Sequence, residues 1–478
     1  MRFWAIILMQ SKITSARAIG QSTLVLAVGA LLGSCGSGGS NETAGPGGGP
    51  PGIDPPREFE MLVIDPPCPI AGGGYGFSTV PMDWNGDGLL DIGLGAPGEE
   101  RAYVLLGGGA DPFREQLRFD LNGPAGCPTP GSPPGNLGES VTAGDIDGDG
   151  DDELVVGAPS TTVDGRLEAG AVYVYGLADL GDAPLVLTTT VEGASFFGSE
   201  VRMGDFDADG LQDLAIGESH SLVDGVTAGA VTVVFGVASP IESRVRLPNP
   251  APVANGRFGT HMSIDDGDGD GFPDLYVAAL GNTASNGSEF AGQLFVFWGP
   301  PTPDGMMVLD DALAIDDDFP RFGMFIHAAG GKITVGAPRK NLLGVPDTGQ
   351  AFRWEGPSFR APALFEHPSP LDFDLYGYRV YLADLIGDSR LDQVVVNLGP
   401  SGVEFRNPAT LYIYDGGENT DDPFVLIPAG DSGSHFAVGM SAGQVVPGGK
   451  DELILGDSRY DRPGTGQNED SGRLVIYF

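Results

Sequence analysis

Basic residues are scarce in this sequence. Its 478 residues include 25 Lys and Arg against 65 Asp and Glu, which gives a formal net charge of −40. A surface with this balance repels phosphate backbones, so we expect no nucleic-acid binding. It attracts divalent cations, and much of the acidity is gathered in short clusters.

Long uninterrupted helices are also excluded. The chain contains 77 Gly and 39 Pro, and both residues interrupt helices. Short strands joined by many turns fit this composition better. Hydrophobic residues make up 41% of the chain, which is enough to form a core, so the chain is not generally disordered.

The hydrophobic run near the N-terminus is short. It extends from Leu24 to Leu32, follows several basic residues, and is too short to span a bilayer as a stable helix. It leads into Leu-Gly-Ser-Cys, ending at Cys35, which resembles the lipobox of bacterial lipoproteins. An ordinary cleaved signal with a chance Cys is the alternative interpretation.

The lipobox resemblance implies a signal peptide over residues 1–34 and a lipidated Cys35. Residues 35–58 are rich in Gly, Pro and Ser and are expected to form a flexible tether. Gly36 stands where lipoproteins retained at the inner membrane carry Asp. The resemblance therefore implies an exported protein at the outer membrane or cell surface, attached to the membrane through its lipid anchor only.

Cysteine is nearly absent. Besides Cys35 the chain has only Cys68 and Cys127, each a similar distance before a repeat. A disulfide between them is compatible with export, and so are two free thiols.

An aromatic-Gly or similar pair recurs along the rest of the chain at spacings of 54 to 64 residues. After each pair come two short runs rich in Val and aromatic residues, and a further run precedes the next pair, which is typical of strands. The segment leading out of each pair supplies a fourth run. The seven pairs are Tyr75-Gly76, Leu137-Gly138, Phe197-Gly198, Phe258-Gly259, Phe322-Gly323, Tyr376-Gly377 and a degraded Phe436-Ala437.

Four short strands per repeat, seven times over, predict an all-β fold: a seven-bladed β-propeller over residues 59–478. One blade cannot bury both of its faces alone, so neighbouring blades must stack and the ring must close. The chain ends within a strand at Phe478. We expect residues 59–64 to supply the missing strand of the last blade and so close the ring.

The repeats are similar to the FG-GAP repeats of the integrin α-subunit N-terminal propeller and its bacterial relatives. Residues 95–97, 157–159 and 336–338 all read Gly-Ala-Pro, the second half of that motif. The resemblance covers residues from about 59 to 478 and implies a propeller with cation-binding loops. In integrins these loops fall in the later blades, whereas here acidic loops occupy the first four. No inserted ligand-binding domain is visible, so the family's ligand site is not transferred to this chain.

Each of the first four repeats contains a loop of the form D-x-[DN]-x-D-G-x-x-[DE]. Alternate side chains of such a loop point toward one centre, and Ca²⁺ accepts six to eight oxygen ligands. Positions one, three, five and nine offer side-chain oxygen, position seven offers its carbonyl, and Gly at position six permits the tight turn. The predicted ligands are Asp83, Asn85, Asp87, Leu89 and Asp91; Asp145, Asp147, Asp149, Asp151 and Glu153; Asp205, Asp207, Asp209, Leu211 and Asp213; and Asp266, Asp268, Asp270, Phe272 and Asp274.

An EF-hand begins similarly but requires Glu at position twelve and a following helix. Position twelve is Leu94, Val156, Ile216 or Val277, so that interpretation fails in all four loops. We therefore predict about four Ca²⁺ sites.

The remaining repeats have degraded loops. The sixth loop keeps Asp384, Asp388 and Asp392, but Ile386 replaces the third ligand and Ser389 replaces the Gly, so we expect weak or no binding. The fifth and seventh repeats offer no comparable set of acids.

Three functions remain open. The first is a calcium-binding, non-catalytic surface scaffold for adhesion or for binding a protein or glycan ligand. The alternative is a calcium-dependent hydrolase or lyase acting on polysaccharide or phosphoester. The third is a purely structural part of a larger assembly.

The sequence favours a non-enzymatic scaffold. The five histidines are dispersed, and no H-E-x-x-H or G-x-S-x-G motif occurs. The obvious carboxylates are already assigned to calcium, so they are poor general acids. Trp84, within the first loop, is a candidate glycan platform, whereas Trp298 and Trp354 lie in strand-like runs and are expected in the core.

Overall fold

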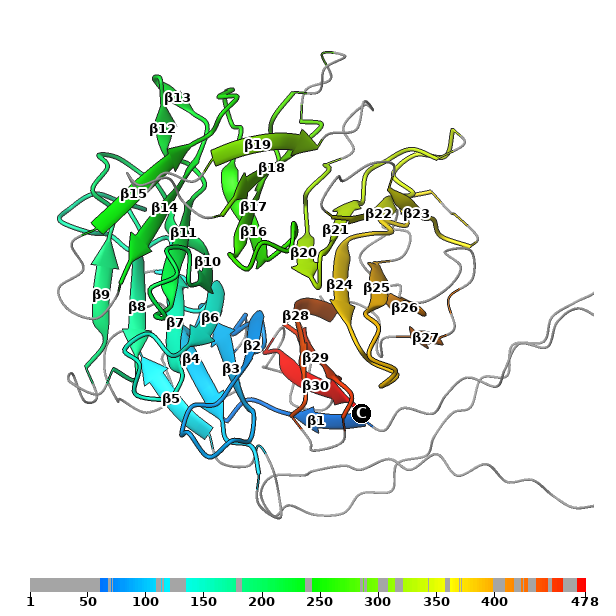
Figure 1. Ribbon diagram of the computed structural model, residues 1–478, viewed down its shortest axis with the longest axis horizontal. Coiled ribbons are helices and arrows are strands. Elements are labelled where there is room, and N and C mark those ends of the chain that lie inside the picture. The colour runs from blue at the N-terminus through cyan, green and yellow to red at the C-terminus, as the bar shows by residue number, and fades with distance from the viewer. Residues whose placement is uncertain are drawn as a thin grey trace, which may run out of the picture.

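A computed structural model shows a ring of seven four-stranded antiparallel sheets around a central axis (Figure 1). The described residues are 61–67, 70, 72–108, 113, 116–120, 135–177, 183–236, 243–283, 287, 290–299, 308–313, 321–342, 344–356, 362–368, 370, 372–398, 409–416, 423, 425–428, 436–445, 449–458 and 471–478.

The strands follow the seven repeats, so each blade is built from one stretch of chain and the last is shared between both ends. Blades one and two contain β2 (Ser78–Met82), β3 (Asp91–Ala96), β4 (Arg101–Leu105) and β5 (Gln116–Asp120), then β6 (Ser140–Gly144), β7 (Glu153–Ala158), β8 (Ala171–Tyr175) and β9 (Leu185–Thr188). Blades three and four contain β10 (Phe197–Gly204), β11 (Asp213–Glu218), β14 (Ala230–Phe235) and β15 (Ser243–Pro248), then β16 (Phe258–Asp265), β17 (Asp274–Ala279), β18 (Gln293–Trp298) and β19 (Val308–Leu313). Blades five to seven contain β20 (Ile326–Ala329), β21 (Lys332–Ala337), β22 (Gln350–Glu355) and β23 (Ala363–Phe365), then β24 (Arg379–Ala383), β25 (Asp392–Asn397), β26 (Thr410–Tyr414) and β27 (Val425–Pro428), then β28 (Phe436–Gly443), β29 (Glu452–Asp457), β30 (Arg473–Tyr477) and β1 (Met61–Ile64).

Little other regular structure occurs in the described part of the chain. A short hairpin joins β12 (Leu222–Val223) to β13 (Val226–Thr227), and a 3₁₀ turn, η1, spans Pro97–Glu99. Among these residues no helix has the length and apolar character needed to cross a bilayer.

The predicted all-β, seven-bladed propeller of four-stranded blades is confirmed. In each complete repeat the first strand lies at the centre of the ring and the fourth at its edge, and the first strands of neighbouring blades contact one another around the whole ring, including β28 with β2. β1 pairs antiparallel with β30, with Val63 opposite Val475, so strands from both ends of the chain share the seventh blade. Phe59 and Glu60 of the expected closing segment lie outside the described residues.

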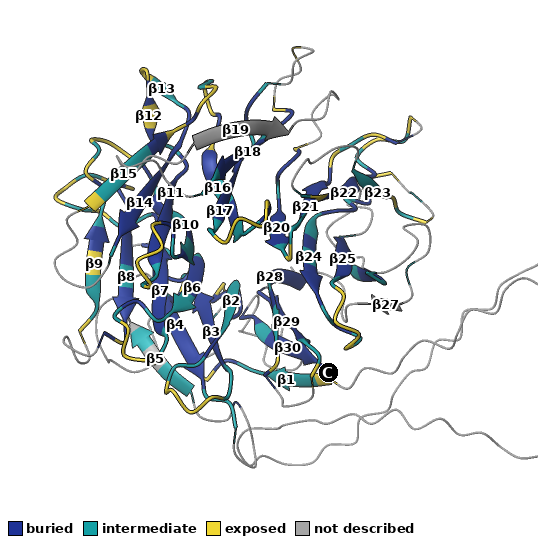
Figure 2. Cartoon of the chain, viewed as in Figure 1, coloured by how far each residue is buried: buried dark blue, intermediate teal, exposed yellow. Residues whose placement is uncertain are grey.

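The hydrophobic core lies between the blades. Seven clusters of buried side chains occur, and each combines residues from two neighbouring blades. Val155 and Val172 of blade two, for example, share a cluster with Phe197 and Leu214 of blade three. The second strands are buried along almost their whole length, whereas exposed residues gather in loops and outer strands (Figure 2). A single blade would expose half of two such clusters to water, at roughly 25 cal/mol for each Å² of apolar surface.

Glycine pairs explain why the two halves of the repeat motif recur together. Gly157 of blade two faces Gly198 of blade three, and a Cβ added to Gly157 would lie 2.1 Å from the Gly198 carbonyl oxygen. Gly198 itself has φ +89°, which glycine adopts without strain. The backbones of Gly456 in the last blade and Gly76 in the first also approach each other closely. The glycines therefore allow the backbones of neighbouring blades to meet at each of these seams.

Candidate metal-binding loops

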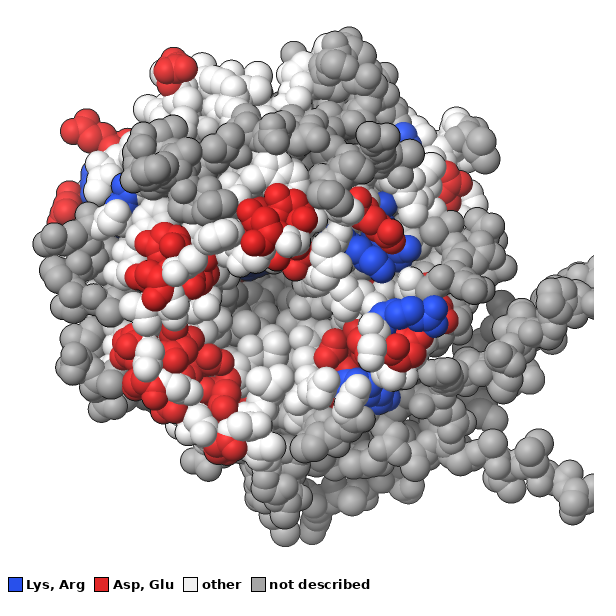
Figure 3. Space-filling model, in the orientation of Figure 1, with Lys and Arg blue, Asp and Glu red and all other residues white. Residues whose placement is uncertain are grey.

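The four predicted loops lie at equivalent places in the ring. Each connects the first strand of its blade to the second, and all four therefore open on the same face of the propeller. Figure 3 shows Asp and Glu side chains gathered in separate clusters around the central hollow on the face in view. The sequence repeat thus becomes a ring of acidic loops.

Each loop is closed by backbone hydrogen bonds to the carboxylate at its position one. In the first, the Asp83 carboxylate accepts from the backbone N–H of Asp87 at 3.1 Å and of Gly88 at 2.9 Å. Gly88, at position six, has φ +78°, as the sequence predicts for the tight turn. Asp205 and Asp266 accept the equivalent two N–H groups in the third and fourth loops, whereas Asp145 of the second loop accepts those of Gly148 and Gly150. The curl of the loop is therefore encoded by its own acidic side chains.

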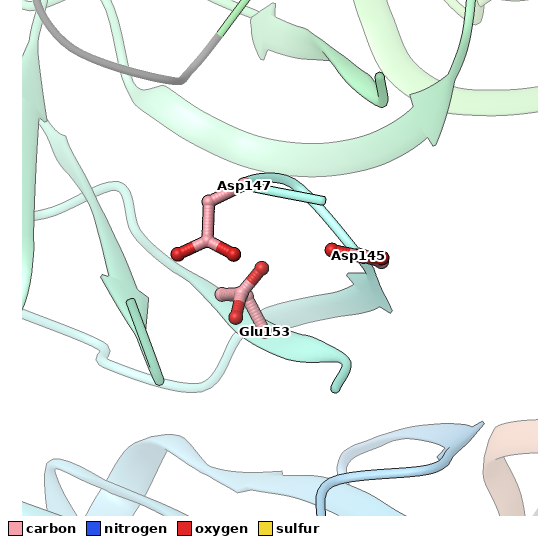
Figure 4. Close-up of side chains that lie close together, drawn as sticks. All are labelled: Asp145, Asp147 and Glu153. Atoms are coloured by element: carbon pink, nitrogen blue, oxygen red, sulfur yellow. The ribbon is translucent and has the colours of Figure 1, made fainter. Parts of the chain in front are cut away.

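Three of the loops bring carboxylates together tightly enough to hold a cation. In the second loop, oxygens of Asp145, Asp147 and Glu153 all lie within 4.8 Å of one another, and Figure 4 shows the three side chains around a common space. The third loop does the same with Asp205, Asp207 and Asp213, and the fourth with Asp266, Asp268 and Asp274. The first loop has Asn85 at position three, which supplies an amide oxygen in place of a carboxylate.

The acid at position five is arranged differently from those at positions one, three and nine. The Asp149 carboxylate accepts the backbone N–H of residue 151 at 3.0 Å, and Asp209 accepts that of Leu211 at 2.9 Å. The groups within 4.8 Å comprise positions one, three and nine of each loop. Positions five and seven remain predicted ligands, with Leu89, Asp151, Leu211 and Phe272 offering backbone carbonyls.

The position-nine carboxylates are buried and carry a second role. Asp213 is 0% exposed, and its two oxygens accept the N–H groups of Phe206 at 2.8 Å and Gly236 at 2.9 Å. It thereby fixes the loop to the end of the third strand of its blade. The same pair of bonds is made by Asp91, by Asp274 and, in the sixth blade, by Asp392. This structural role explains why blade six keeps its ninth acid although the rest of the loop has changed.

Crowding of negative charge in these loops is visible in the pKa values. Burial raises the pKa of Glu153 to about 7; its hydrogen bond from Ile146 lowers the pKa, and the charges of Asp147, Asp149 and Asp145 raise it. Burial likewise raises the pKa of Asp213 and of Asp274 to about 6. Two carboxylates about 4 Å apart repel by roughly 4 kcal/mol at an effective dielectric near 20. A bound divalent cation would remove that repulsion.

In the sixth loop an arginine side chain lies beside the acids. Its backbone follows the other loops, with the Asp384 carboxylate accepting from Asp388 N–H at 3.0 Å and Ser389 N–H at 2.8 Å. The guanidinium of Arg390 donates from Nε to Asp388 at 2.8 Å and lies 3.5 Å from Asp415. Ser389 holds φ +65° where the other loops have Gly. An arginine side chain thus pairs with the acid at position five, and weak or no metal binding in this loop stays a prediction.

Position two of each loop was missed by the sequence analysis. It is apolar in the first three loops and in the sixth, and it points inward: Ile146 and Phe206 are 0% exposed. Trp84 occupies this position in the first loop, half-buried, with its ring 5.3 Å from that of Phe119. Trp84 is therefore half-buried and not exposed as expected, and its role as a glycan platform stays a prediction. Trp354 is buried in the core and Trp298 packs against it, as expected.

The loops also connect neighbouring blades. Asp152 of the second loop accepts the N–H of Asp83 in the first loop at 2.7 Å, and its own N–H donates to the Asp83 carbonyl at 2.9 Å. Asp451 and Asp384 make the same reciprocal pair between blades seven and six. These acids contribute to the seams between blades, and the adjacency of Asp151, Asp152 and Glu153 is the only sequence signal that could have revealed one of them.

Two other groups of predicted residues have different outcomes. The histidines, interpreted as dispersed surface residues, are in part brought together: His220, His261 and His327 line one central cavity. Cys35, Cys68, Cys127 and His435 lie outside the described residues, so lipidation and a disulfide stay predictions.

Comparisons with known proteins agree with this architecture. The FG-GAP repeat model matches residues 137–175 and 197–234, which correspond to the first three strands of blades two and three. Integrin alpha-5 of Xenopus laevis is 31% identical over 225 residues, covering 43% of this chain and 20% of the integrin. Integrin alpha-IIb of Homo sapiens is 34% identical over 155 residues, covering 30% of this chain and 15% of the integrin.

An enzyme and a solved structure are also similar to the chain. Phosphatidylinositol-glycan-specific phospholipase D of Mus musculus is 30% identical over 241 residues, covering 47% of this chain and 28% of the enzyme. The solved Dos1 propeller is 13% identical, with 84% of this chain and 77% of that chain covered at a TM-score of 0.42. The alignments thus span less than a third of the length of these curated relatives. The chain therefore carries FG-GAP repeats in blades two and three, folds as a seven-bladed propeller, and is similar in sequence to integrin α subunits.

Proposed function

We propose that the chain is a calcium-binding, non-catalytic propeller that is held at the cell surface and binds a protein or glycan ligand. The observation that carries the proposal is the convergence of three carboxylates in each of three equivalent loops. Carboxylate clusters of this density are costly without a cation, and their repetition in successive blades indicates one common function.

Calcium suits these loops better than other metals. All the predicted ligands are oxygens, and the described loops contain no His or Cys, which Zn²⁺ favours. Ca²⁺ accepts six to eight oxygens in flexible geometry, so one ion can use side chains at positions one, three, five and nine together with the carbonyl at position seven. Four such sites occupy blades one to four in this proposal.

Isothermal titration of the calcium-free protein with Ca²⁺ tests the stoichiometry. We expect about four ions, because four loops carry the complete pattern. Replacing Asp145 and Asp149 with Ala should reduce the count by one. Glu192→Ala is the matched control, because Glu192 is an exposed acid outside the loops. A double variant that still binds as many ions as the unmodified chain would contradict the assignment of the second loop.

The similarity to a phospholipase D supports one alternative function. A calcium-dependent hydrolase or lyase acting on phosphoester or polysaccharide would make the acidic loops part of a reaction centre. Bis(p-nitrophenyl) phosphate hydrolysis, measured with Ca²⁺ and with EDTA, distinguishes the two functions. We expect no release of p-nitrophenol; calcium-dependent release that disappears in the Asp145→Ala variant would favour the enzyme.

The location and the partner are tested in cells. If Cys35 carries the lipid, Cys35→Ala should move the protein from the membrane fraction to the soluble fraction. Cross-linking on intact cells, with and without Ca²⁺, should recover a surface protein or glycan only when calcium is present. A Cys35→Ala protein that remains membrane-bound would exclude the lipid anchor while leaving the calcium assignment intact.

A further inference from the structure

The centre of the ring encloses a cavity of about 830 Å³. Its wall is formed mainly by the first strands of the blades, which place equivalent residues around the axis. The third residue after the aromatic of each repeat forms one such ring. Its members in blade order are Ser78, Ser140, Glu200, His261, Phe325, Arg379 and Gly439, and all seven line the cavity.

The lining has the opposite charge balance to the whole chain. Three arginines but only two glutamates line the cavity, although acids outnumber basic residues 65 to 25 in the sequence. Glu200 and Arg202 lie in β10 and Arg379 lies in β24, whereas Glu139 and Arg257 lie just before β6 and β16. The excess of arginine over glutamate in the cavity wall therefore favours the binding of an anion.

Most of the channel charges are already compensated. Arg202 forms an ion pair with Glu200, and its Nε donates to the Met262 carbonyl at 3.0 Å. Burial lowers the pKa of His261 and of His327 to about 3, and the nearby arginines lower it as well, so both imidazoles are neutral at physiological pH. His327 also accepts the N–H of Leu382 through Nδ1 at 3.2 Å.

Arg379 forms no ion pair with a described residue, although the charge of Glu200, which pairs with Arg202, raises its pKa. Its guanidinium carbon lies 3.4 Å from the centroid of the Phe325 ring, an arrangement that holds the group flat against the wall. Among the described residues no carboxylate lies within ion-pair distance of it, and its buried Nε has no hydrogen-bond partner. Burial lowers the pKa of Arg379 to about 10, so the group stays charged. A buried donor left unsatisfied costs about 1–3 kcal/mol, which a bound acceptor would recover.

The end of the channel away from the acidic loops carries further positive charge. Arg257 lies just before β16, whereas the acidic loop of that blade follows its end, so the strand separates the two. Arg257 and Arg339 both lower the pKa of Arg321, after the larger effect of burial, which places the three cations near one another. All three are exposed, and none forms an ion pair with a described residue. This mouth offers an approach for an anion that avoids the acidic face.

We propose that the central channel binds a small organic anion, a carboxylate or phosphate group on a compact ring, with Arg379 as the anchoring cation. Guanidinium binds both oxyanions through paired N–H donors, and the volume lies in the range of small-molecule sites. Phe196, Tyr378 and Tyr381 line the same cavity and provide apolar faces for a ring. The site is separate from the calcium loops and does not depend on their assignment.

Isothermal titration of the calcium-loaded protein with glucuronate, glucose 6-phosphate and glucose tests the proposal. We expect at least one of the two anions to bind and neutral glucose not to bind. The anion that binds more tightly identifies the carboxylate or the phosphate as the preferred group. The proposal is overturned if neither anion binds, or if glucose binds as well as the anions.

Variants then locate the site. Arg379→Gln should weaken anion binding about tenfold or more, since it removes a charged hydrogen-bond donor, and Arg379→Lys should retain part of the affinity. Arg244→Gln is the matched control, because Arg244 bonds to the Thr188 carbonyl at 2.8 Å in the outer strands. Glu200→Gln should tighten binding, because it frees Arg202. Equal affinity in the Arg379→Gln and Arg244→Gln proteins, both shown to be folded by their melting temperatures, would refute the site.

Discussion

The third and sixth loops form a natural pair for testing how calcium stabilises the ring. Asp205 and Asp384 occupy position one of their loops. Asp205 accepts the backbone N–H groups of residues 209 and 210, both at 3.0 Å, and Asp384 accepts those of residues 387, 388 and 389, at 2.7, 3.0 and 2.8 Å. Only Asp205 belongs to a convergent group of carboxylates. Replacement of either by Asn therefore removes similar local bonds, but only Asp205→Asn removes a calcium ligand.

The magnitudes follow from these contacts. Without calcium, each substitution should cost about 1 kcal/mol of unfolding free energy, the typical net value of a lost hydrogen bond. With free Ca²⁺ at about 100 times its dissociation constant, each occupied site adds about 2.7 kcal/mol of stability by mass action. Asp205→Asn should therefore lose up to about 2.7 kcal/mol of the calcium-induced stabilisation, whereas Asp384→Asn should lose almost none.

Urea unfolding in EDTA and in calcium, followed by tryptophan fluorescence, measures both quantities for each variant. The decisive value is the difference between the two calcium responses, because this difference cancels the local structural cost. If Asp384→Asn reduces the calcium response as much as Asp205→Asn, then convergence of carboxylates does not determine binding, and the reasoning fails.

Further predictions concern pH, packing and repair of the degraded loop. The folded pKa of Glu153, about 7, lies above its ordinary value of 4.5, so the calcium-free folded protein takes up a proton as the pH falls through 7. That proton must leave when calcium binds, so the calcium-induced rise in melting temperature should be largest above pH 7 and shrink toward pH 5; a rise that grows on acidification would be contrary to this. Phe197→Ala should cost about 3–5 kcal/mol in urea unfolding, because the ring is 0% exposed in the cluster between blades two and three; a loss below about 1 kcal/mol would mean that this seam does not hold the ring. The triple variant Ile386→Asp, Ser389→Gly, Arg390→Leu restores the loop pattern in blade six and should bind one more Ca²⁺ by titration, and an unchanged count would show that the pattern is insufficient.

Much of this architecture could be predicted from the sequence because the repeat is local. The aromatic-Gly pair, the second-strand run and the acidic loop recur at a nearly constant spacing, and each reports a conformation within about twenty residues. The strand bounds and the left-handed glycine at position six follow directly from these patterns. Gly88 is a clear case, since the turn it makes closes within its own loop.

Contacts between blades could not be predicted in the same way. The bond between Asp152 and Asp83 joins residues 69 positions apart, and its only sequence signal is the run of three acids at residues 151–153. The same limitation explains the error at Trp84, whose acidic neighbours indicate exposure although its ring packs on Phe119 of the outer strand. The channel histidines are scattered in the sequence because each comes from a different blade.

Blade six keeps the fold of the loop although its ligand pattern is incomplete. Asp392 still joins the loop to the third strand, accepting the N–H of Gly416 at 3.1 Å, and Arg390 supplies a permanent positive charge. The structural and ligand roles of the acids are therefore separable, residue by residue.

The placement of the seven apolar clusters between blades, rather than within them, has a consequence for how the protein is made and degraded. During synthesis the apolar face of blade one that packs on blade seven has no partner until the last sixty or so residues have emerged. The growing chain therefore exposes this apolar surface almost to the end of synthesis. A chaperone that covers this apolar face would matter more here than for a protein whose domains each enclose their own core. A truncated product that lacks the final blade should be prone to aggregation and proteolysis.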